Sequence, residues 1–249
     1  MIKNFIKILE NFFSLDYTGK KDIWLTRQES LTLFVGILGV LLPILLWGFT
    51  YWDLKLICPL ESISHYYYTR VCGIFVVIMS MLALLLLNFK GEEPIDFIIS
   101  FIAGLFSIFV LLFPTDNISN VSSCCNTPSQ IDACVTFISS NPDRELFHYV
   151  SAGIFLGCLT FMSLFSFTRV KNDQITPSGN MKLNKKLRNM IYITMGIIMI
   201  CAMAFIYIGP KILSQEIYNK YSLTFWMESI AVWGFGVSWI IKSKIVLKD

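Results

Sequence analysis

The stretch LTLFVGILGVLLPILLWGF, residues 31–49, contains nineteen residues and no charged side chain. A helix needs about 20 apolar residues to cross the hydrocarbon core of a bilayer. Lipid offers no partners to backbone N–H and C=O groups, so a spanning segment of this kind must be helical. Five further stretches have the same character, at residues 71–87, 95–113, 147–167, 190–208 and 223–241. The sequence therefore predicts an all-α integral membrane protein, built as a bundle of six transmembrane helices.

The composition of the 249-residue chain agrees with this fold class. Hydrophobic residues make up 55% and charged residues 15%, with a mean hydropathy of +0.64, whereas soluble domains carry about 25% charged residues. The apolar runs are continuous, which argues against the ~10-residue alternating segments of a β-barrel. The net charge of +3 is too small to indicate a nucleic-acid partner. We expect one transmembrane domain over residues 31–249.

Lysine and arginine are distributed unequally between the two sides of the predicted spans. Fifteen of the 20 fall on the side that holds both termini, and five fall on the other. Because cytoplasmic loops are enriched in positive charge, both termini are predicted to be cytoplasmic. The loop 114–146 is then extracytoplasmic, and the basic loop 168–189 is cytoplasmic. High usage of Lys, Ile and Asn suggests a bacterial source, and hence the inner (cytoplasmic) membrane.

Residues 1–30 are predicted to form a cytoplasmic amphipathic helix and its lead-in to the first span. Apolar residues recur at three- and four-residue steps from Ile2 to Phe13, and Lys3 and Lys7 occupy the other face. Such a helix would lie in the membrane interface, with its lysines at anionic headgroups. Packing against the inner face of the protein itself is the alternative.

Four cysteines fall in the loops that are assigned to the outside, and none falls in an inside loop. These disulfide candidates are Cys58, Cys124, Cys125 and Cys134. Oxidising compartments favour disulfides, so one or two bridges are expected. Four cysteines allow three pairings, and the sequence does not choose among them. A redox role for the vicinal pair lacks the usual C-x-x-C spacing.

Ionisable side chains are scarce in the spans, and those close to the membrane gather at the extracytoplasmic ends. His65 lies just before the second span, Asp116 follows the third, and His148 lies in the first turn of the fourth. Glu228 lies one to two turns inside the sixth span. A charged group near the bilayer centre costs about 2.5–3.5 kcal/mol on insertion scales, so such residues are usually paired or functional.

These side chains allow three interpretations. Two imidazoles with carboxylates can act as acid and base, which makes His65, Asp116, His148 and Glu228 the candidate catalytic residues. The candidate substrate-binding residues are Ser62, Tyr66 and Tyr149. A divalent metal would be a cofactor held by His65, His148 and Asp116. In the third interpretation, the same groups hydrogen-bond one another as a structural plug between helices.

The strings SISHYYYTR (62–70), FPTD (113–116) and HYVSAGIF (148–155) carry a family resemblance. They resemble uncharacterised bacterial six-pass membrane proteins, which are in turn distantly similar to the Frag/DRAM-type superfamily. The resemblance implies a six-helix bundle with a polar site that faces outward. A likeness to the alkaline ceramidase superfamily fails, because its zinc site needs three histidines and this chain has two.

The sequence leaves three functions open. The first is an extracytoplasm-facing polar pocket that binds, and in one version modifies, a membrane lipid or another amphiphile. The second is an oligomeric pore or membrane-disrupting effector, for which a homo-oligomer could form through the small-residue face at Gly153 and Gly157. The third is a structural or assembly role without a small-molecule ligand.

Overall fold

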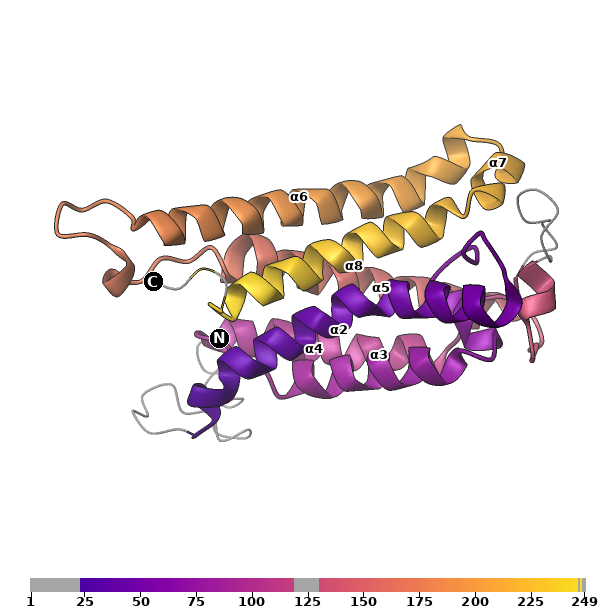
Figure 1. The fold of residues 1–249 in the computed structure, drawn as a ribbon, viewed down its shortest axis with the longest axis horizontal. Helices are drawn as coiled ribbons and strands as arrows, with labels where there is room; N and C mark the ends of the chain where they lie inside the picture. Colours follow the sequence, from indigo (N-terminus) through magenta and orange to yellow (C-terminus); the bar gives the residue numbers. More distant parts are fainter. Residues whose placement is uncertain (1–22, 119–129, 246, 248–249) are drawn as a thin grey trace.

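The computed structural model describes residues 23–118, 130–245 and 247. The described residues are all-helical, without a β-strand, and the longer helices run side by side as an elongated bundle (Figure 1). The helices are α2 (Ile23–Leu54), η1 (Ser64–Tyr68), α3 (Cys72–Leu87), α4 (Pro94–Leu112), η2 (Gln130–Ala133), α5 (Pro142–Phe161), η3 (Met162–Ser166), η4 (Asn172–Gln174), α6 (Leu183–Ile212), α7 (Gln215–Lys220) and α8 (Leu223–Lys242).

Five of these helices are long and apolar enough to cross a membrane, which fits an integral membrane protein. They are α2, α4, α5 with its continuation η3, α6 and α8. The remaining predicted span corresponds to α3, which has 16 residues. At 1.5 Å per residue, α3 extends about 24 Å, less than the ~30 Å of a typical hydrocarbon core. The sixth crossing therefore remains a prediction.

The bundle has two distinct ends (Figure 1). The end that we call the histidine end comprises residues 55–71, 113–118, 134–141 and 213–222. The end that we call the lysine end comprises residues 88–93, 167–182 and 243–245. The first residue of α2 and the last residue of α8 both lie next to the lysine end (Figure 1).

Residues 55–63, between α2 and η1, form a non-helical segment. Leu56 and Leu60 in this segment are buried. Two hydrogen bonds fasten it to the start of α8: Ser222 Oγ donates to Pro59 O at 2.7 Å, and Phe225 N donates to Glu61 O at 2.9 Å. Irregular backbone is tolerated at membrane depth where protein covers it. These contacts hold the non-helical segment against the start of α8.

Helix α8 packs closely against α2 at two glycines. A Cβ atom at Gly236 would lie 2.8 Å from Gly36 O and 2.8 Å from Val40 Cγ2. A Cβ atom at Gly36 would lie 2.7 Å from Gly236 O. Small residues let two helix backbones approach in a membrane, where dispersion contacts take the place of the hydrophobic effect. The Gly36–Gly236 contact thus sets the spacing of α2 and α8.

Gly236→Ala is expected to lower the free energy of unfolding by about 1–3 kcal/mol, because the new methyl group meets backbone atoms that cannot move aside. Gly153→Ala is the matched control, since nothing lies within 4 Å of a Cβ atom there. This change should stabilise α5 by about 0.5–1 kcal/mol through helix propensity. Unfolding in mixed detergent micelles measures both, and equal effects would contradict the packing argument.

Two predictions concern residues outside the described ranges. The amphipathic helix falls on residues 1–22, and Cys124 and Cys125 fall on residues 119–129, so neither is tested. Cys134 and Cys58 are not joined by a disulfide in the structure. Burial and the nearby Glu61 carboxylate raise the pKa of Cys134 to about 11, so the thiol stays protonated and unreactive at neutral pH.

Candidate functional site

The candidate site lies at the histidine end and begins with a serine–histidine contact. Ser62 Oγ lies 2.7 Å from His65 Nδ1, and the His65 backbone N–H donates to the same oxygen at 3.3 Å. A hydroxyl group has two lone pairs and one hydrogen, so Ser62 Oγ can accept from the backbone and also donate to Nδ1. The Asp116 carboxylate faces Nε2 and favours the tautomer that carries its hydrogen there, in which Ser62 is the donor to Nδ1. The Ser62 and His65 side chains are both buried.

His148 occupies a second serine–histidine contact. Its Nδ1 lies 2.8 Å from Phe113 O, so this nitrogen carries the hydrogen and donates it. Its Nε2 accepts from Ser64 Oγ at 3.0 Å. Both ring nitrogens are occupied by protein partners, which joins α4, α5 and η1 at this end of the bundle. His148 is thus a crosslink between elements, with no nitrogen left over for a metal.

Asp116 lies beside the first contact, in the segment that follows α4. Its Oδ1 accepts from Thr115 Oγ1 at 2.8 Å and from Tyr149 Oη at 3.0 Å. The carboxylate side chain is 48% exposed. Arg144 supports the segment by donating through Nε to Pro114 O at 3.0 Å. Asp116 is therefore held in place, yet it remains open to solvent on one side.

An unfilled hydrogen-bond position separates His65 from Asp116. The distance from His65 Nε2 to Asp116 Oδ1 is 3.8 Å, beyond the 2.7–3.2 Å range of a hydrogen bond. Nε2 is buried and has no hydrogen-bond partner among the described residues. A buried unsatisfied donor costs about 1–3 kcal/mol. A polar group that binds in this gap and accepts from Nε2 would therefore recover this cost.

His65 should make stability depend on pH. Burial lowers its pKa from 6.5 to about 4, because the raising effect of the Asp116 carboxylate offsets only part of the effect of burial and His148 adds a smaller lowering effect. Between pH 6.5 and 4 the unfolded chain binds a proton that the folded chain excludes, so stability falls as pH decreases through this window. We expect a loss of about 3 kcal/mol in wild type. His65→Gln should lack this component in pH-dependent unfolding measurements, and an unchanged pH profile would contradict the assignment.

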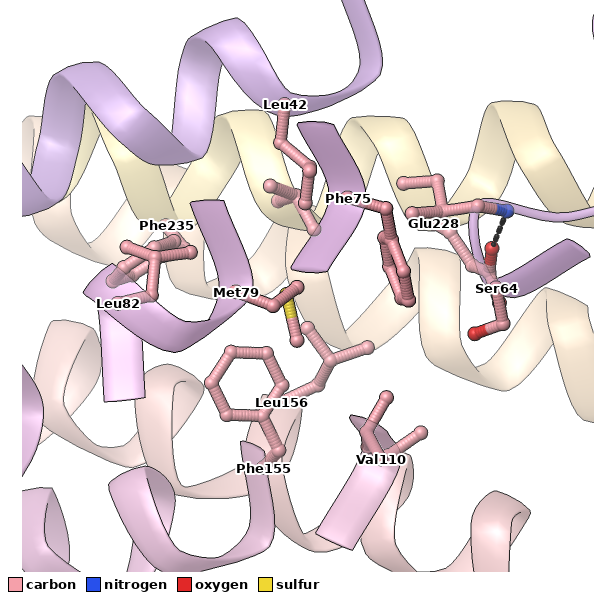
Figure 2. A pocket seen from close by; sticks show the side chains of 13 residues that line it. Leu42, Ser64, Phe75, Met79, Leu82, Val110, Phe155, Leu156, Glu228 and Phe235 are labelled. Carbon is pink, nitrogen blue, oxygen red and sulfur yellow. Dashed lines mark hydrogen bonds between the residues drawn. The ribbon is translucent and has the colours of Figure 1, made fainter. Parts of the chain in front are cut away.

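Glu228 lies apart from the histidine contacts, at one end of a cavity inside the bundle (Figure 2). Its Oε2 accepts from the backbone N–H of Ile63 at 2.6 Å, which ties α8 to η1. The cavity has a volume of about 50 Å³. Its lining is apolar apart from Glu228 and Ser64, and extends away from them to Leu82 and Phe235 (Figure 2). The hydrogen bond gives Glu228 the partner that its position in a span demands.

The remaining predicted residues divide into two groups. Tyr149 belongs to the cluster through Asp116, whereas Tyr66 is fully buried and its hydroxyl accepts from Leu60 N at 3.3 Å. Tyr66 packs on Phe225 in the core, with ring centroids 5.9 Å apart.

Ser64 was not among the residues predicted from the sequence. Its position next to His65 was the available signal, but helical spacing assigned it to another face.

The metal interpretation finds no support in the described part of the chain. Within residues 23–118 and 130–245, no group of three or more His, Cys, Asp or Glu side chains could hold a metal ion. The two histidines are committed in different ways: His148 uses both nitrogens, and His65 offers one nitrogen, which faces one carboxylate. The donor set therefore does not fit a divalent metal.

What the cluster can do chemically is to bind and relay a proton. Ser62, His65 and Asp116 form a serine–imidazole–carboxylate series, in which Ser62 and His65 are in hydrogen-bond contact but His65 and Asp116 are not.

Comparison with family models, with characterised proteins and with solved structures found no match to this chain. The function must therefore be inferred from this geometry.

Proposed function

We propose that this membrane protein binds the polar head of a hydroxyl-bearing amphiphile in the gap between His65 and Asp116. One observation carries the proposal, namely the buried Nε2 of His65, which lacks a partner and faces a half-exposed carboxylate 3.8 Å away. The cost of a buried unsatisfied donor is recovered when a ligand supplies the missing acceptor.

The two sides of the gap define the chemistry of the head. Nε2–H of His65 needs an acceptor, and the open side of the Asp116 carboxylate can accept a further hydrogen. A hydroxyl group can do both with one oxygen, which would lie off the line between the two atoms, about 2.8 Å from each. An ester or ether oxygen could accept from His65 but would donate no hydrogen bond to Asp116. The head is therefore an alcohol, such as that of a glycerol or a sugar.

The tail is proposed to enter the cavity beside Ser64. Ser64 contacts His148 and also lines the cavity, which places the apolar space next to the polar cluster. An engineered apolar cavity that binds benzene measures about 150 Å³, three times the volume here. A space of about 50 Å³ favours a few methylene groups of one alkyl chain over a ring.

The site is proposed to face the extracytoplasmic side of a bacterial inner membrane. The excess of lysine and arginine on the other side, fifteen of 20, supports this orientation, with both termini in the cytoplasm. The histidine end then lies at the level of the outer-leaflet headgroups. A lipid could reach it by lateral diffusion within the bilayer.

Photocrosslinking tests the proposal with lipids that share a tail. The purified protein is placed in phosphatidylcholine nanodiscs, because phosphatidylcholine carries no hydroxyl, and is labelled with a monoacylglycerol that bears a diazirine in its chain. Labelled peptides are expected from the cavity lining on α5 and α8. Monooleoylglycerol should compete at least tenfold better than methyl oleate, which has the same tail and lacks the hydroxyls. Equal competition, or labelling confined to other helices, would refute the proposal.

A further inference from the structure

A second cavity lies at the lysine end, on the opposite side of the molecule from the histidine cluster. Its volume is about 270 Å³. Residues from α2, from the α3–α4 connection, from the segment after η3 and from the end of α8 line it together. The charged members of the lining are Glu29, Lys90, Glu92, Lys171, Lys242 and Lys244. Four lysines against two glutamates leave an excess of two positive charges.

Glu92 organises two of these lysines. Its Oε1 accepts from Lys242 Nζ at 2.7 Å, and its Oε2 lies 3.4 Å from Lys171 Nζ. Burial raises the pKa of Glu92, but the two ammonium groups more than offset it and hold the pKa at about 2. The carboxylate is therefore ionised at neutral pH and holds both ammonium groups at the cavity.

A buried ion pair fixes the walls of the cavity. Arg169 binds Asp96 through two hydrogen bonds, Nη1 to Oδ2 at 2.9 Å and Nη2 to Oδ1 at 2.6 Å. Asp96 Oδ2 also accepts from the backbone N–H of Glu92 at 3.0 Å. Gly91 makes the turn possible, with φ at +71°. The connection that carries Glu92 and the segment that carries Lys171 are thereby held to the same carboxylate.

We propose that this cavity binds a phosphate group, presented by an anionic lipid headgroup or by a free phosphate compound. An ammonium group has three donors, so the contact between Lys242 and Glu92 leaves donors for a ligand. Lysine ammonium groups bind phosphate oxygens as point charges. Lysines next to a membrane span attract anionic lipids, each by a factor of about five. This site is independent of the proposed function at the histidine end.

Phosphate is favoured over a carboxylate ligand by the charge that the cavity presents. Several ammonium groups converge from different elements, and a phosphate offers several anionic oxygens to them at once, whereas a carboxylate offers two. The volume of about 270 Å³ exceeds what a single ion needs and accommodates a phosphate with part of its attached group. Lys242 ends α8, so the site lies where an apolar helix meets the headgroup region.

Native mass spectrometry in a zwitterionic amine-oxide detergent tests the proposal. The probes are dioleoyl phosphatidylglycerol, dioleoyl phosphatidylcholine and inorganic pyrophosphate. We expect phosphatidylglycerol to bind in preference to phosphatidylcholine, or pyrophosphate to bind directly. The double variant Lys171→Gln/Lys244→Gln should weaken binding about 25-fold, a factor of about five for each lysine.

The matched control is Lys182→Gln/Lys186→Gln, which changes the net charge equally at the same end but outside the cavity lining. It should leave the affinity within about twofold of wild type, because those charges are solvent-screened. Pyrophosphate that displaces phosphatidylglycerol identifies a free phosphate compound as the ligand, and phosphatidylglycerol binding without competition identifies a lipid headgroup. Equal losses in the two double variants, or no binding of either phosphate probe, would overturn the proposal.

Discussion

Asp96→Ala is expected to lower the free energy of unfolding by about 3–5 kcal/mol, the usual cost of removing one partner of a buried ion pair. Asp96 is 3% exposed and forms a two-bond contact with Arg169. It also accepts the backbone N–H groups of Glu92 and Glu93 at the start of α4. The alanine variant leaves a guanidinium group and two N–H groups without their acceptor. Unfolding in mixed micelles measures the loss.

Asp173→Ala serves as the control for this change. Asp173 belongs to the same end of the bundle but is exposed, so its removal should alter stability by less than about 0.5 kcal/mol. Arg169→Lys should give an intermediate loss, because lysine keeps the charge but lacks the planar fork that matches a carboxylate. A loss at Asp96 no larger than at Asp173 would show that the ion pair does not hold the lysine end together.

Asp116→Asn is expected to weaken binding of a hydroxyl-bearing amphiphile about 10- to 100-fold. The neutral amide loses a charge-assisted hydrogen bond, which contributes about 1.5–3 kcal/mol. The carboxylate is 48% exposed, so its replacement leaves no buried charge unpaired and the protein should remain folded. The concentration of monooleoylglycerol that halves diazirine labelling measures the affinity.

Asp143→Asn provides the comparison, since Asp143 is an exposed carboxylate at the same end of the bundle. It makes the same change in charge without touching the gap, and its affinity should match wild type. Competition by methyl oleate should be unchanged in both variants, because that ligand has no hydroxyl to lose. If Asp116→Asn binds monooleoylglycerol as tightly as Asp143→Asn does, Asp116 does not contact the head.

The long apolar helices could be predicted because the hydropathy that marks them is a property of a local window of sequence. The predicted stretches 95–113 and 223–241 correspond to α4 (Pro94–Leu112) and α8 (Leu223–Lys242), and each predicted boundary agrees with the observed one to within one residue. Helix α2 extends beyond the predicted stretch 31–49 at both ends. Residues 23–30 and 50–54 continue α2 beyond its apolar part, and hydropathy alone does not register helix in polar residues.

The site was predicted only in part, because the segment before α3 takes its shape from distant residues. Helical spacing placed Ser62, His65 and Tyr66 on one face. Contacts with α8, such as Ile63 N to Glu228 Oε2, instead fold the segment into a short 3₁₀-helix. Tyr66 turns into the core, and Ser64 reaches His148. These two contacts join residues that are 84 and 165 positions apart in the sequence, so no local sequence pattern predicts them.

A density map of the wild-type protein in phosphatidylcholine nanodiscs with monooleoylglycerol tests the central claim most directly. The map must resolve the space between His65 Nε2 and Asp116 Oδ1. We predict an oxygen within hydrogen-bond distance of both atoms, continuous with an alkyl chain that passes Ser64 into the cavity. A direct contact between the imidazole and the carboxylate, or an isolated water with the cavity closed, would contradict it.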